Sequence, residues 1–516
     1  MKKRAIVIST SLLVVVIVVL GIIYAKKQMI IFKPEYAKGE LLIKFKPALK
    51  SDAIKSSLAK LNAVPISSFR RIGVQHIKLP KGLNVKEAIK MLEDDPNVEY
   101  AEPNYMLYLD FIPNDPRFPE QWALNNTGGT GGTPDADIDA AEAWDIERGS
   151  DSVVIGITDT GIDYNHEDLS SNIWVNSGET PGDGIDNDVN GYKDDVHGFD
   201  FALDNSDPMD CHDHGTHVAG IIGAIGDNDI GVAGINFHTR MMALKIFVPL
   251  NCGCIQLGAT GTVADAVEGI LYAVNNKAMI INASWHHENA ASLRDAIAYA
   301  DSLGVLFVAA AGNDSKDNDI TPFFPANYGA PPYNLKNVIA VASTDHNNDL
   351  SSFSNWGKTT VHLGAPGEDI LSTIRGNKYG LMSGTSMASP QVAGVAGLVW
   401  SHYPDMNYLQ VKDCILDNVD VIPSLTGKTI TDGRLNAEKA VICPGAIPDS
   451  SAAPKLSLTQ QENLSSGNAL YISQLRLKYK SDVLFKYGYY CMLLVPVFFI
   501  LGWKKLIRRS KKHKRS

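Results

Sequence analysis

The segment VADAVEGILYAVNNKAMIINASWHHENAASLRDAIAYADSLGVLFVAAAGN, residues 263–313, alternates two kinds of hydrophobic pattern. Residues 263–276 and 292–304 repeat apolar side chains at the spacing of amphipathic helices. Residues 279–284 and 305–313 are short and almost continuously apolar, which is typical of strands that are buried on both faces. Helices that alternate with such strands predict a parallel sheet with helices on both faces.

Apolar segments on both sides of this stretch continue the pattern, and they include VVIGITD (153–159), HVAGIIGAI (217–225), MMALKIF (241–247) and NVIAVAST (337–344). We therefore expect a doubly wound, mostly parallel α/β domain over residues 114–445. In such a sheet the binding site lies beyond the carboxyl ends of the strands. Asp159 and Asn313 both stand where an apolar strand ends, so we expect the site at this edge.

Three short motifs each place one polar residue of a catalytic type at the edge of an apolar element. They are VVIGITDTGID (153–163) with Asp159, HDHGTHVAG (212–220) with His214, and GTSMASPQVAGVAGLV (384–399) with Ser386. A serine hydroxyl needs a neighbouring base to act as a nucleophile, and that base needs a partner that fixes its tautomer. Asp, His and Ser in this order along the chain form one of the known hydrolytic triads.

Each residue alone has a plainer interpretation, since an Asp after a strand often forms a turn and a Ser before a helix is often an N-cap. The order and the separations, 55 positions from Asp159 to His214 and 172 from His214 to Ser386, favour the catalytic interpretation. All three motifs closely resemble those of subtilisin-like serine proteases, the subtilase family, and especially its thermitase-like and fervidolysin-like members. The resemblance covers about 330 residues of the main domain.

The resemblance implies roles for four residues. Asp159 would orient His214, which would take the proton of Ser386 as general base, and an acyl-enzyme would form on the serine. Asn313, in VLFVAAAGN, matches the family's side-chain donor to the tetrahedral intermediate. The backbone N–H of Ser386 would be the second donor.

The family lines its specificity pocket with a segment that ends in Ser-Leu/Trp-Gly-Gly. Here INASWHHENA (281–290) retains Ser284 and Trp285, but His286 and His287 replace the glycines. Glycine at these positions lets the substrate backbone approach closely. Two imidazoles are therefore expected to narrow the pocket or to favour an acidic or small side chain. The alternative is that both rings point into solvent.

Calcium is the expected cofactor, at two positions. The loop DGIDNDVNGYKDD (183–195) contains the spacing D-x-D-x-N-G, which suits a cation that binds about six to eight oxygens. The candidate ligands in this loop are Asp186, Asp188, Asn190, Asp194 and Asp195. The loop lacks the final glutamate of an EF-hand, and an acidic solvated loop is the alternative. By resemblance to thermitase-like relatives, Asp115, Asp168 and Asn228 form a second site, which would fix the N-terminal segment of the domain to its core.

Residues 35–108 have a pattern of their own. GELLIKFKP (39–47) and VQHIKLP (74–80) read as strands, and NVKEAIKMLEDDPNVEYAEPNY (84–105) reads as a helix followed by a strand. This pattern predicts a small α+β domain of the ferredoxin-like type. It resembles the propeptides of subtilases, which act as chaperones and occupy the active site. We therefore expect an intramolecular inhibitor and a processing bond near residues 105–114.

Two apolar runs predict membrane segments at the ends of the chain. Residues 5–25 carry no charge and follow Lys-Lys-Arg, so residues 1–26 are expected to be an N-terminal anchor or, alternatively, a cleaved signal peptide. Residues 487–503 are also apolar, and a tail with eight Lys or Arg residues, 504–516, follows them. The positive-inside rule then places both termini in the cytoplasm and the catalytic domain on the extracytoplasmic side, extracellular or periplasmic.

The composition is that of a globular protein with a large core, since 45% of the 516 residues are hydrophobic and 20% are charged. The basic tail would suit nucleic acid, but its position beside an apolar run favours a membrane, so no nucleic-acid partner is expected. Residues 446–485 are rich in Ser, Ala, Pro and Gln and read as a linker. Six cysteines fit an oxidising compartment, and Cys414 and Cys443 are candidates for a pair.

The leading hypothesis is a calcium-stabilised serine endopeptidase that is made as a membrane-associated zymogen, cleaves itself and acts on protein or peptide substrates. An inactive subtilase scaffold that serves as a binding or adhesion module is one alternative, although such a scaffold has no need of Asp159, His214, Asn313 and Ser386 together. A peptide ligase or cyclase is another alternative, because ligation uses the same acyl-enzyme.

Overall fold

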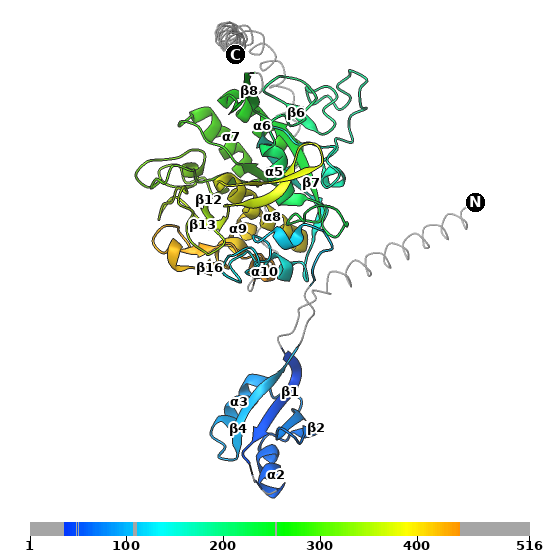
Figure 1. The fold of residues 1–516 in the computed structure, drawn as a ribbon, viewed down its shortest axis with the longest axis vertical. Coiled ribbons are helices and arrows are strands. Elements are labelled where there is room, and N and C mark those ends of the chain that lie inside the picture. Colours follow the sequence, from blue (N-terminus) through cyan, green and yellow to red (C-terminus); the bar gives the residue numbers. More distant parts are fainter. Residues whose placement is uncertain (1–35, 48, 50, 107–110, 253–254, 444–516) are drawn as a thin grey trace, which may run out of the picture. The chain divides into compact units, whose positions relative to one another are not determined.

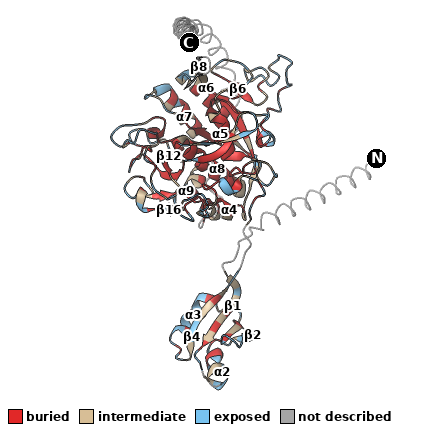
Figure 2. Ribbon diagram, in the orientation of Figure 1, coloured by how far each residue is buried: buried red, intermediate tan, exposed pale blue. Residues whose placement is uncertain are grey.

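The computed structural model describes residues 36–47, 49, 51–106, 111–252 and 255–443 (Figure 1). The chain divides into two compact units, one that ends at Asp110 and one that begins at Phe111. Each unit has a hydrophobic core of its own, and Figure 2 shows these buried residues in red.

The first unit is a four-stranded antiparallel sheet with two helices. Its strands are β1 (Tyr36–Phe45), β2 (Val64–Phe69), β3 (Val74–Lys78) and β4 (Val98–Tyr105), in the spatial order β2-β3-β1-β4. The helices are α2 (Ser51–Lys60) and α3 (Val85–Glu93). Leu41, Ile43 and Phe45 alternate along β1 and are buried against these helices. This alternation is typical of a sheet that is covered on one face only.

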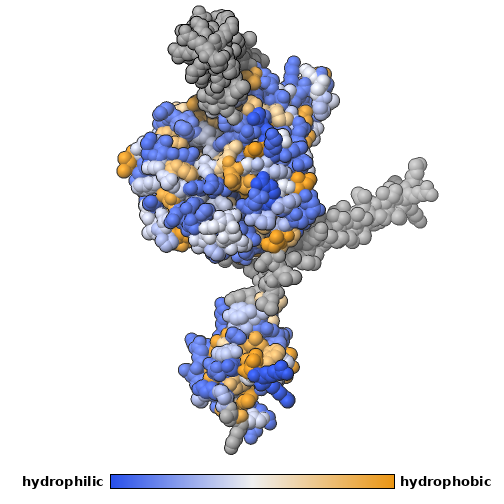
Figure 3. All heavy atoms as spheres, viewed as in Figure 1, coloured by the Kyte–Doolittle hydropathy of each residue, from blue (hydrophilic) through white to orange (hydrophobic). Residues whose placement is uncertain are grey.

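Strand β2 lies at the edge of this sheet and exposes apolar side chains. Val64 is 65% exposed, Ile66 49% and Phe69 47%. In Figure 3, hydrophobic residues gather on the visible face of this unit. A group of exposed apolar side chains on a small domain marks an interaction surface.

The second unit is built on a nine-stranded sheet in the order β16-β17-β13-β12-β11-β10-β5-β7-β6. Its central strands are β5 (Gly149–Asp159), β7 (His238–Lys245), β10 (Ile280–Ala283), β11 (Leu306–Ala310), β12 (Val338–Thr344) and β13 (Leu363–Pro366), all paired in parallel. The outer strands are β6 (Gly198–Asp200), β17 (Gly433–Arg434) and the antiparallel β16 (Asp420–Val421). The strand order reverses at β5, and such a reversal is where ligands bind in open α/β sheets.

Helices cover both faces of this sheet. α5 (His214–Gly223) and α8 (Thr385–His402) pack on one face, whereas α6 (Val263–Asn275) and α7 (Ala291–Ser302) pack on the other. Within β10, Ile280 belongs to the core on the side of α5 and α8, and Ile281 belongs to the core on the side of α6 and α7. Because successive side chains of a strand point to opposite faces, a continuously apolar strand fills both cores.

Smaller elements complete the second unit. They are the helices α4 (Ala140–Ala143), α9 (Tyr408–Leu416) and α10 (Ala437–Ile442), the strand pairs β8 (Val248–Cys252) with β9 (Ile255–Thr260) and β14 (Ile370–Ile374) with β15 (Lys378–Met382), and four 3₁₀ turns, Phe118–Glu120, Ser170–Asn172, Ala326–Gly329 and Pro423–Leu425. The doubly wound α/β architecture that the sequence predicts is thus present.

The predicted transmembrane segments require a correction. Residues 5–25 and 487–503 lie outside the described residues, and so does the linker 446–485. Across the described part of the chain, no helix combines the length and the apolarity needed to cross a bilayer. The longest of these helices, α8, has 18 residues and includes Ser, Thr, Gln and Pro390, whereas a span needs about 20 mostly apolar residues. The fold class with flanking membrane segments and the membrane-anchored, extracytoplasmic location are therefore withdrawn.

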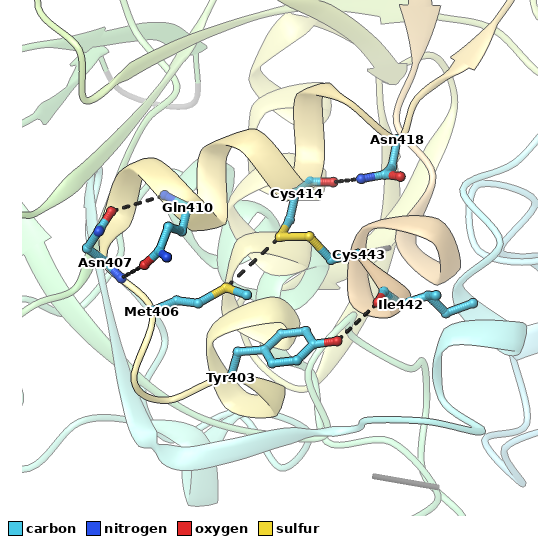
Figure 4. Close-up of a disulfide and its surroundings, with 8 residues drawn as sticks. All are labelled: Tyr403, Met406, Asn407, Gln410, Cys414, Asn418, Ile442 and Cys443. Carbon is cyan, nitrogen blue, oxygen red and sulfur yellow. Dashed lines mark hydrogen bonds between the residues drawn. A yellow bond between two sulfur atoms is a disulfide. The ribbon is translucent and has the colours of Figure 1, made fainter. Parts of the chain in front are cut away.

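A disulfide bond joins Cys414 of α9 to Cys443, the residue that ends α10 (Figure 4). Beside it, the hydroxyl of Tyr403 donates a hydrogen bond to the backbone oxygen of Ile442 at 3.0 Å. The bond spans 29 positions of the chain. Cys211 forms no disulfide with any described residue.

We expect the double substitution Cys414→Ala and Cys443→Ala to lower the free energy of unfolding by about 3–4 kcal/mol, because the unfolded chain regains the entropy of an open loop of this length. Urea unfolding, followed by circular dichroism, measures this change. Cys211→Ala is the matched control and should leave the midpoint within error. Equal losses in both variants would contradict the assignment.

Candidate active site

The carboxylate of Asp159 and the imidazole of His214 are in direct contact. Asp159 is the last residue of β5, and His214 is the first residue of α5. Nδ1 of His214 lies 2.8 Å from Oδ1 and 3.0 Å from Oδ2 of Asp159. Because a carboxylate only accepts hydrogen bonds, Nδ1 carries the proton and Nε2 of the neutral ring has a free lone pair. The ring is therefore set up to accept a proton at Nε2.

Gly215 allows α5 to begin this close to β5. A Cβ atom at position 215 would lie 2.1 Å from the backbone oxygen of Gly161 and 3.1 Å from Cβ of Asp159. Any side chain here would push the start of the helix away from the strand. The glycine after His214 is thus a requirement of the contact with Asp159.

The pKa of His214 is set by opposing effects. Burial lowers this pKa, but the charge and the hydrogen bond of Asp159 raise it more, so that it lies above the ordinary value of 6.5. The side chain of Asp159 is 2% exposed and that of His214 is 25% exposed. A charge pair that is largely shielded from water stabilises the protonated ring more than an exposed pair would.

Ser386 is the second residue of α8, where backbone N–H groups have no partner within the helix. Its hydroxyl donates a hydrogen bond to the backbone oxygen of Ser284 at 3.1 Å, and no hydrogen bond joins it to His214 among the described residues. Rotation about χ1 would release the hydroxyl from Ser284. Catalytic hydrogen bonds often form only when substrate is bound.

The side chain of Asn313, which follows β11, is held in one orientation by Thr385. Its Oδ1 accepts hydrogen bonds from the backbone N–H of Thr385 at 2.8 Å and from the Thr385 hydroxyl at 2.9 Å. A backbone N–H can only donate, so the amide oxygen must face Thr385 and Nδ2 must face the other way. The amide group of Asn313 is thereby available as a donor.

Gly384 leaves a small space next to this amide. From the position that a Cβ atom on Gly384 would take, Nδ2 of Asn313 lies 3.3 Å away and the backbone N of Ser386 lies 3.6 Å away. Two N–H donors therefore border one space beside the serine. This arrangement suits a developing negative charge on oxygen, which needs preorganised donors in a site with little water.

A pocket lies beside these groups, and its walls include Trp285, His286, Asn313, Phe323 and Ser386. The ring of His286 packs against Phe323 with a centroid distance of 4.8 Å. Trp285 is fixed by a hydrogen bond from its Nε1 to the hydroxyl of Thr158 at 3.0 Å. The pocket therefore has aromatic walls on the side of β10.

Of the four residues predicted to bind substrate, Ser284, Trp285 and His286 line the pocket, and His287 does not. The hydroxyl of Ser284 is buried and donates to the backbone oxygen of Ser386 at 2.8 Å, so it ties the end of β10 to α8. His287 turns away from the pocket and packs near Phe324 and Tyr328, at centroid distances of 6.3 and 6.1 Å. Burial lowers the pKa of His287. Of the two imidazoles in place of glycines, His286 is the one that lines the pocket.

The acidic loop brings together some of its predicted ligands. Carboxylate oxygens of Asp188 and Asp195 lie within 4.8 Å of each other and of Glu179, which the sequence analysis missed. Glu179 precedes the D-x-D spacing of the loop, so the motif does not include it. The fold of the chain brings its carboxylate next to Asp188 and Asp195. Asp195 is fully buried, and burial raises its pKa.

The other predicted loop ligands shape the loop itself. Asp186 accepts hydrogen bonds from the backbone N–H groups of Asn190 at 3.0 Å and Gly191 at 2.9 Å. Asp194 accepts one from the N–H of Gly184 at 3.0 Å. The side chain of Asn190 donates to Asp195 at 3.0 Å. Asp186 and Asp194, which the sequence predicts as metal ligands, thus use carboxylate oxygens to hold the loop. Asn190, also predicted as a ligand, points its NH₂ group at Asp195.

The second predicted metal site is buried. Asp115 is 2% exposed and Asp168 is fully buried. Asp168 accepts hydrogen bonds from Nδ2 of Asn228 at 2.8 Å and from the N–H of Val232 at 3.0 Å. Oδ1 of Asp115 is buried and has no hydrogen-bond partner among the described residues. Burial, reinforced by the charge of Asp115, raises the pKa of Asp168 to about 6.

Comparison with known proteins gives consistent matches. A model of the subtilase family matches residues 150–444, and a model of the fervidolysin N-terminal prodomain matches residues 25–104. The chain is 35% identical over 411 residues to a thermophilic serine proteinase of Bacillus sp. (strain AK1), which covers 79% of this chain and 88% of that protein. It is 37% identical over 314 residues to subtilisin-like protease 1 of Plasmodium vivax, with coverage of 58% and 48%. A solved protease from Pseudoalteromonas arctica PAMC 21717 aligns with a TM-score of 0.50 and 28% identity, covering 64% of this chain and 98% of that one.

Proposed function

Because the chain belongs to the subtilase family and is a serine-type endopeptidase with an N-terminal prodomain, we propose that Asp159, His214 and Ser386 are its catalytic triad. The observation that carries the proposal is the contact of Nδ1 of His214 with both oxygens of Asp159, at 2.8 and 3.0 Å, at the carboxyl end of a central strand. This contact fixes the tautomer that a general base needs.

In the proposed mechanism, the Ser386 hydroxyl leaves the backbone oxygen of Ser284 when substrate binds and turns towards Nε2 of His214. His214 takes the hydroxyl proton while Oγ attacks the scissile carbonyl carbon. The oxyanion that forms lies beside Gly384, between Nδ2 of Asn313 and the N–H of Ser386. His214 then gives its proton to the leaving amine, and a water molecule releases the acyl group by the same steps.

We also infer that residues 35–108 inhibit the protease until a bond near residues 105–114 is cut. Three observations support this inference. The residues matched by the prodomain model end at 104, strand β4 ends at Tyr105, and the protease unit begins at Phe111. The exposed apolar side chains of β2 offer this unit a surface for an interaction.

The first test follows self-cleavage of the full-length chain by intact mass. The wild-type protein should yield a product that begins within residues 105–115, whereas Ser386→Ala should stay uncut, because loss of the nucleophile removes about a millionfold in rate in a comparable triad. Ser401→Ala, at the far end of α8, is the matched control and should process normally. A Ser386→Ala protein that still cleaves itself would refute the assignment.

We propose that calcium binds at Asp115, Asp168 and Asn228 and at the cluster of Glu179, Asp188 and Asp195. The buried oxygen of Asp115 without a partner and the neighbouring charge of Asp168 fit a hard cation with oxygen ligands. The carboxylate oxygens of Glu179, Asp188 and Asp195, which lie within 4.8 Å of one another, also fit a hard cation. When bound, the ion would neutralise carboxylates that repel one another.

Calcium should stabilise the Ser386→Ala protein more at pH 7.5 than at pH 4.5. The pKa of Asp168 is raised from its ordinary value of 3.8 to about 6 in the folded state, so without calcium the cost of burying this carboxylate is absent below the ordinary value, grows as the pH rises between the two values, and is fully present above about 6. A bound ion offsets this cost only once the carboxylate is ionised. Calorimetry with calcium or a chelator measures the difference in Tm.

Two variants separate the calcium sites. Asp168→Asn should reduce the dependence of the calcium effect on pH, whereas Asp188→Asn should weaken calcium stabilisation and leave the transition near pH 6 in place. A melting temperature that ignores both calcium and chelator at pH 7.5 would count against both sites. A calcium effect that is equal at the two pH values would count against Asp168 as a ligand.

His286 is proposed to restrict the side chain that the pocket accepts. His286→Gly should remove the ring that packs against Phe323 and raise kcat/KM for substrates with large side chains by about tenfold or more, since roughly 1–3 kcal/mol is at stake in such a pocket. His287→Gly is the control, because His287 lies outside the pocket lining. A peptide library profiles both variants, and identical profiles would refute the role of His286.

A further inference from the structure

Asp210, in the loop before α5, is a buried carboxylate that the proposed mechanism does not use. It is 3% exposed. Its Oδ1 accepts hydrogen bonds from the hydroxyl of Thr160 at 2.9 Å and from the backbone N–H of His212 at 2.8 Å. Its Oδ2 accepts hydrogen bonds from the backbone N–H of Thr216 at 3.0 Å and from the Thr216 hydroxyl at 2.6 Å. Four donors converge on one side chain, which is the full accepting capacity of a carboxylate.

The charge of Asp210 fixes the direction of both threonine hydroxyls. Because a carboxylate only accepts, each hydroxyl donates to Asp210 and keeps its lone pairs for another donor. The hydroxyl of Thr160 accepts the backbone N–H of Gly215 at 3.0 Å. The hydroxyl of Thr216 accepts the backbone N–H of Asp163 at 3.0 Å. Asp210 therefore cross-links the loop after β5 to the first turn of α5.

This cross-link involves Thr160 and Gly215, the residues that directly follow Asp159 and His214 in the chain. Thr160 follows Asp159 and donates its own backbone N–H to Oδ1 of Asp159 at 2.7 Å. Gly215 follows His214. The distance between the carboxylate of Asp159 and the imidazole of His214 thus depends on a hydroxyl that Asp210 orients. A change at Asp210 would reach the pair without any contact with substrate.

The titratable groups that act on or pack against the His214 ring are Asp159 on β5, Asp210 and His212 before α5, and His217 within α5. Cys211 and Asp213 belong to the same segment before α5, and Arg375 lies between β14 and β15. Arg375 pairs with Asp213 at 2.6 Å and so neutralises it. Burial lowers the pKa of His217 to about 4, which leaves this ring neutral at neutral pH. Burial raises the pKa of the Cys211 thiol, so the thiol is also neutral. Burial raises the pKa of Asp210, and the hydrogen bonds from Thr216, His212 and Thr160 oppose this shift. When it is ionised, Asp210 is a second negative charge near the imidazole.

We propose that Asp210 is a positioning residue of the active site, which holds Asp159 and His214 in register through the hydroxyls of Thr160 and Thr216. The inference rests on the proposed triad. It goes beyond that triad because Asp210 acts through other residues: its side chain accepts hydrogen bonds from Thr160, His212 and Thr216.

The test compares Asp210→Asn with Asp213→Asn. An Asn side chain directs an NH₂ group at a site where four donors already converge, so Asp210→Asn should break the cross-link and remove the charge. We expect kcat/KM to fall on the order of 100-fold, mainly in kcat, as for a small misplacement of a catalytic group. Asp213→Asn removes a charge that Arg375 already neutralises and should change kcat/KM less than threefold, roughly.

A second readout does not depend on activity. The pKa of His214, followed by NMR of its ring protons in a Ser386→Ala background, should fall in Asp210→Asn and stay close to the parent value in Asp213→Asn. If wild-type protein lacked peptidase activity, the proposed function would fail, but the titration would still report on Asp210. A folded Asp210→Asn protein with an unchanged His214 pKa and unchanged kcat/KM would overturn the inference.

Thr160→Val covers the case in which Asp210→Asn does not fold. This variant keeps the shape of the side chain and the charge of Asp210, but it removes the hydroxyl between Asp210 and Gly215. We expect a loss of kcat about as large as in Asp210→Asn and a smaller fall in the His214 pKa, because the second charge remains. Full activity of Thr160→Val would overturn the positioning role.

Discussion

Asp159 places a carboxyl group almost out of contact with water at the end of a central strand, and the rest of the site depends on the hydrogen bonds that satisfy it. Its oxygens receive the imidazole of His214 and the backbone N–H of Thr160. A buried charge without such partners would be strongly destabilising. The compensation requires α5 to begin directly against the end of β5, which Gly215 alone permits. The packing of α5 against the end of β5 therefore also sets the distance between Asp159 and His214.

The same problem recurs elsewhere in the protease unit, with different solutions. Asp210 is satisfied by four donors from its own surroundings. Asp115 and Asp168 are buried with one oxygen left without a partner, which is the condition under which a protein gains from binding a cation. We therefore propose different roles for these carboxylates: Asp210 holds the geometry of the site, and Asp115 and Asp168 bind a cation that stabilises the fold. The number of internal donors distinguishes the two cases.

The sequence predicted those features that depend on local pattern. Continuous apolar strands between amphipathic helices are recognisable because each residue of β10 or β11 must fill one of two cores. The structure places the proposed catalytic residues Asp159, His214, Asn313 and Ser386 at or just after the end of a strand or in the first turn of a helix, as their motifs predict. The sequence did not predict that Glu179 joins the acidic cluster, or that His286 packs on Phe323 whereas His287 packs near Phe324. These positions depend on how loops close and on packing between segments that are distant in the sequence. Hydropathy alone predicted membrane segments, and the described residues gave that prediction no support.

The first turn of α8 concentrates several tasks in consecutive residues. Gly384 leaves open the space that borders two donors, Thr385 orients the amide of Asn313 by both its N–H and its hydroxyl, and Ser386 carries the oxygen that we propose as the nucleophile. The hydroxyl of Thr385 also accepts the N–H of Gly312, so β11 and α8 are joined where the two donors meet. Residues that share one network do not contribute independently. A substitution at Thr385 would therefore alter the donor, the space and the nucleophile together, and its effect could not be divided among them.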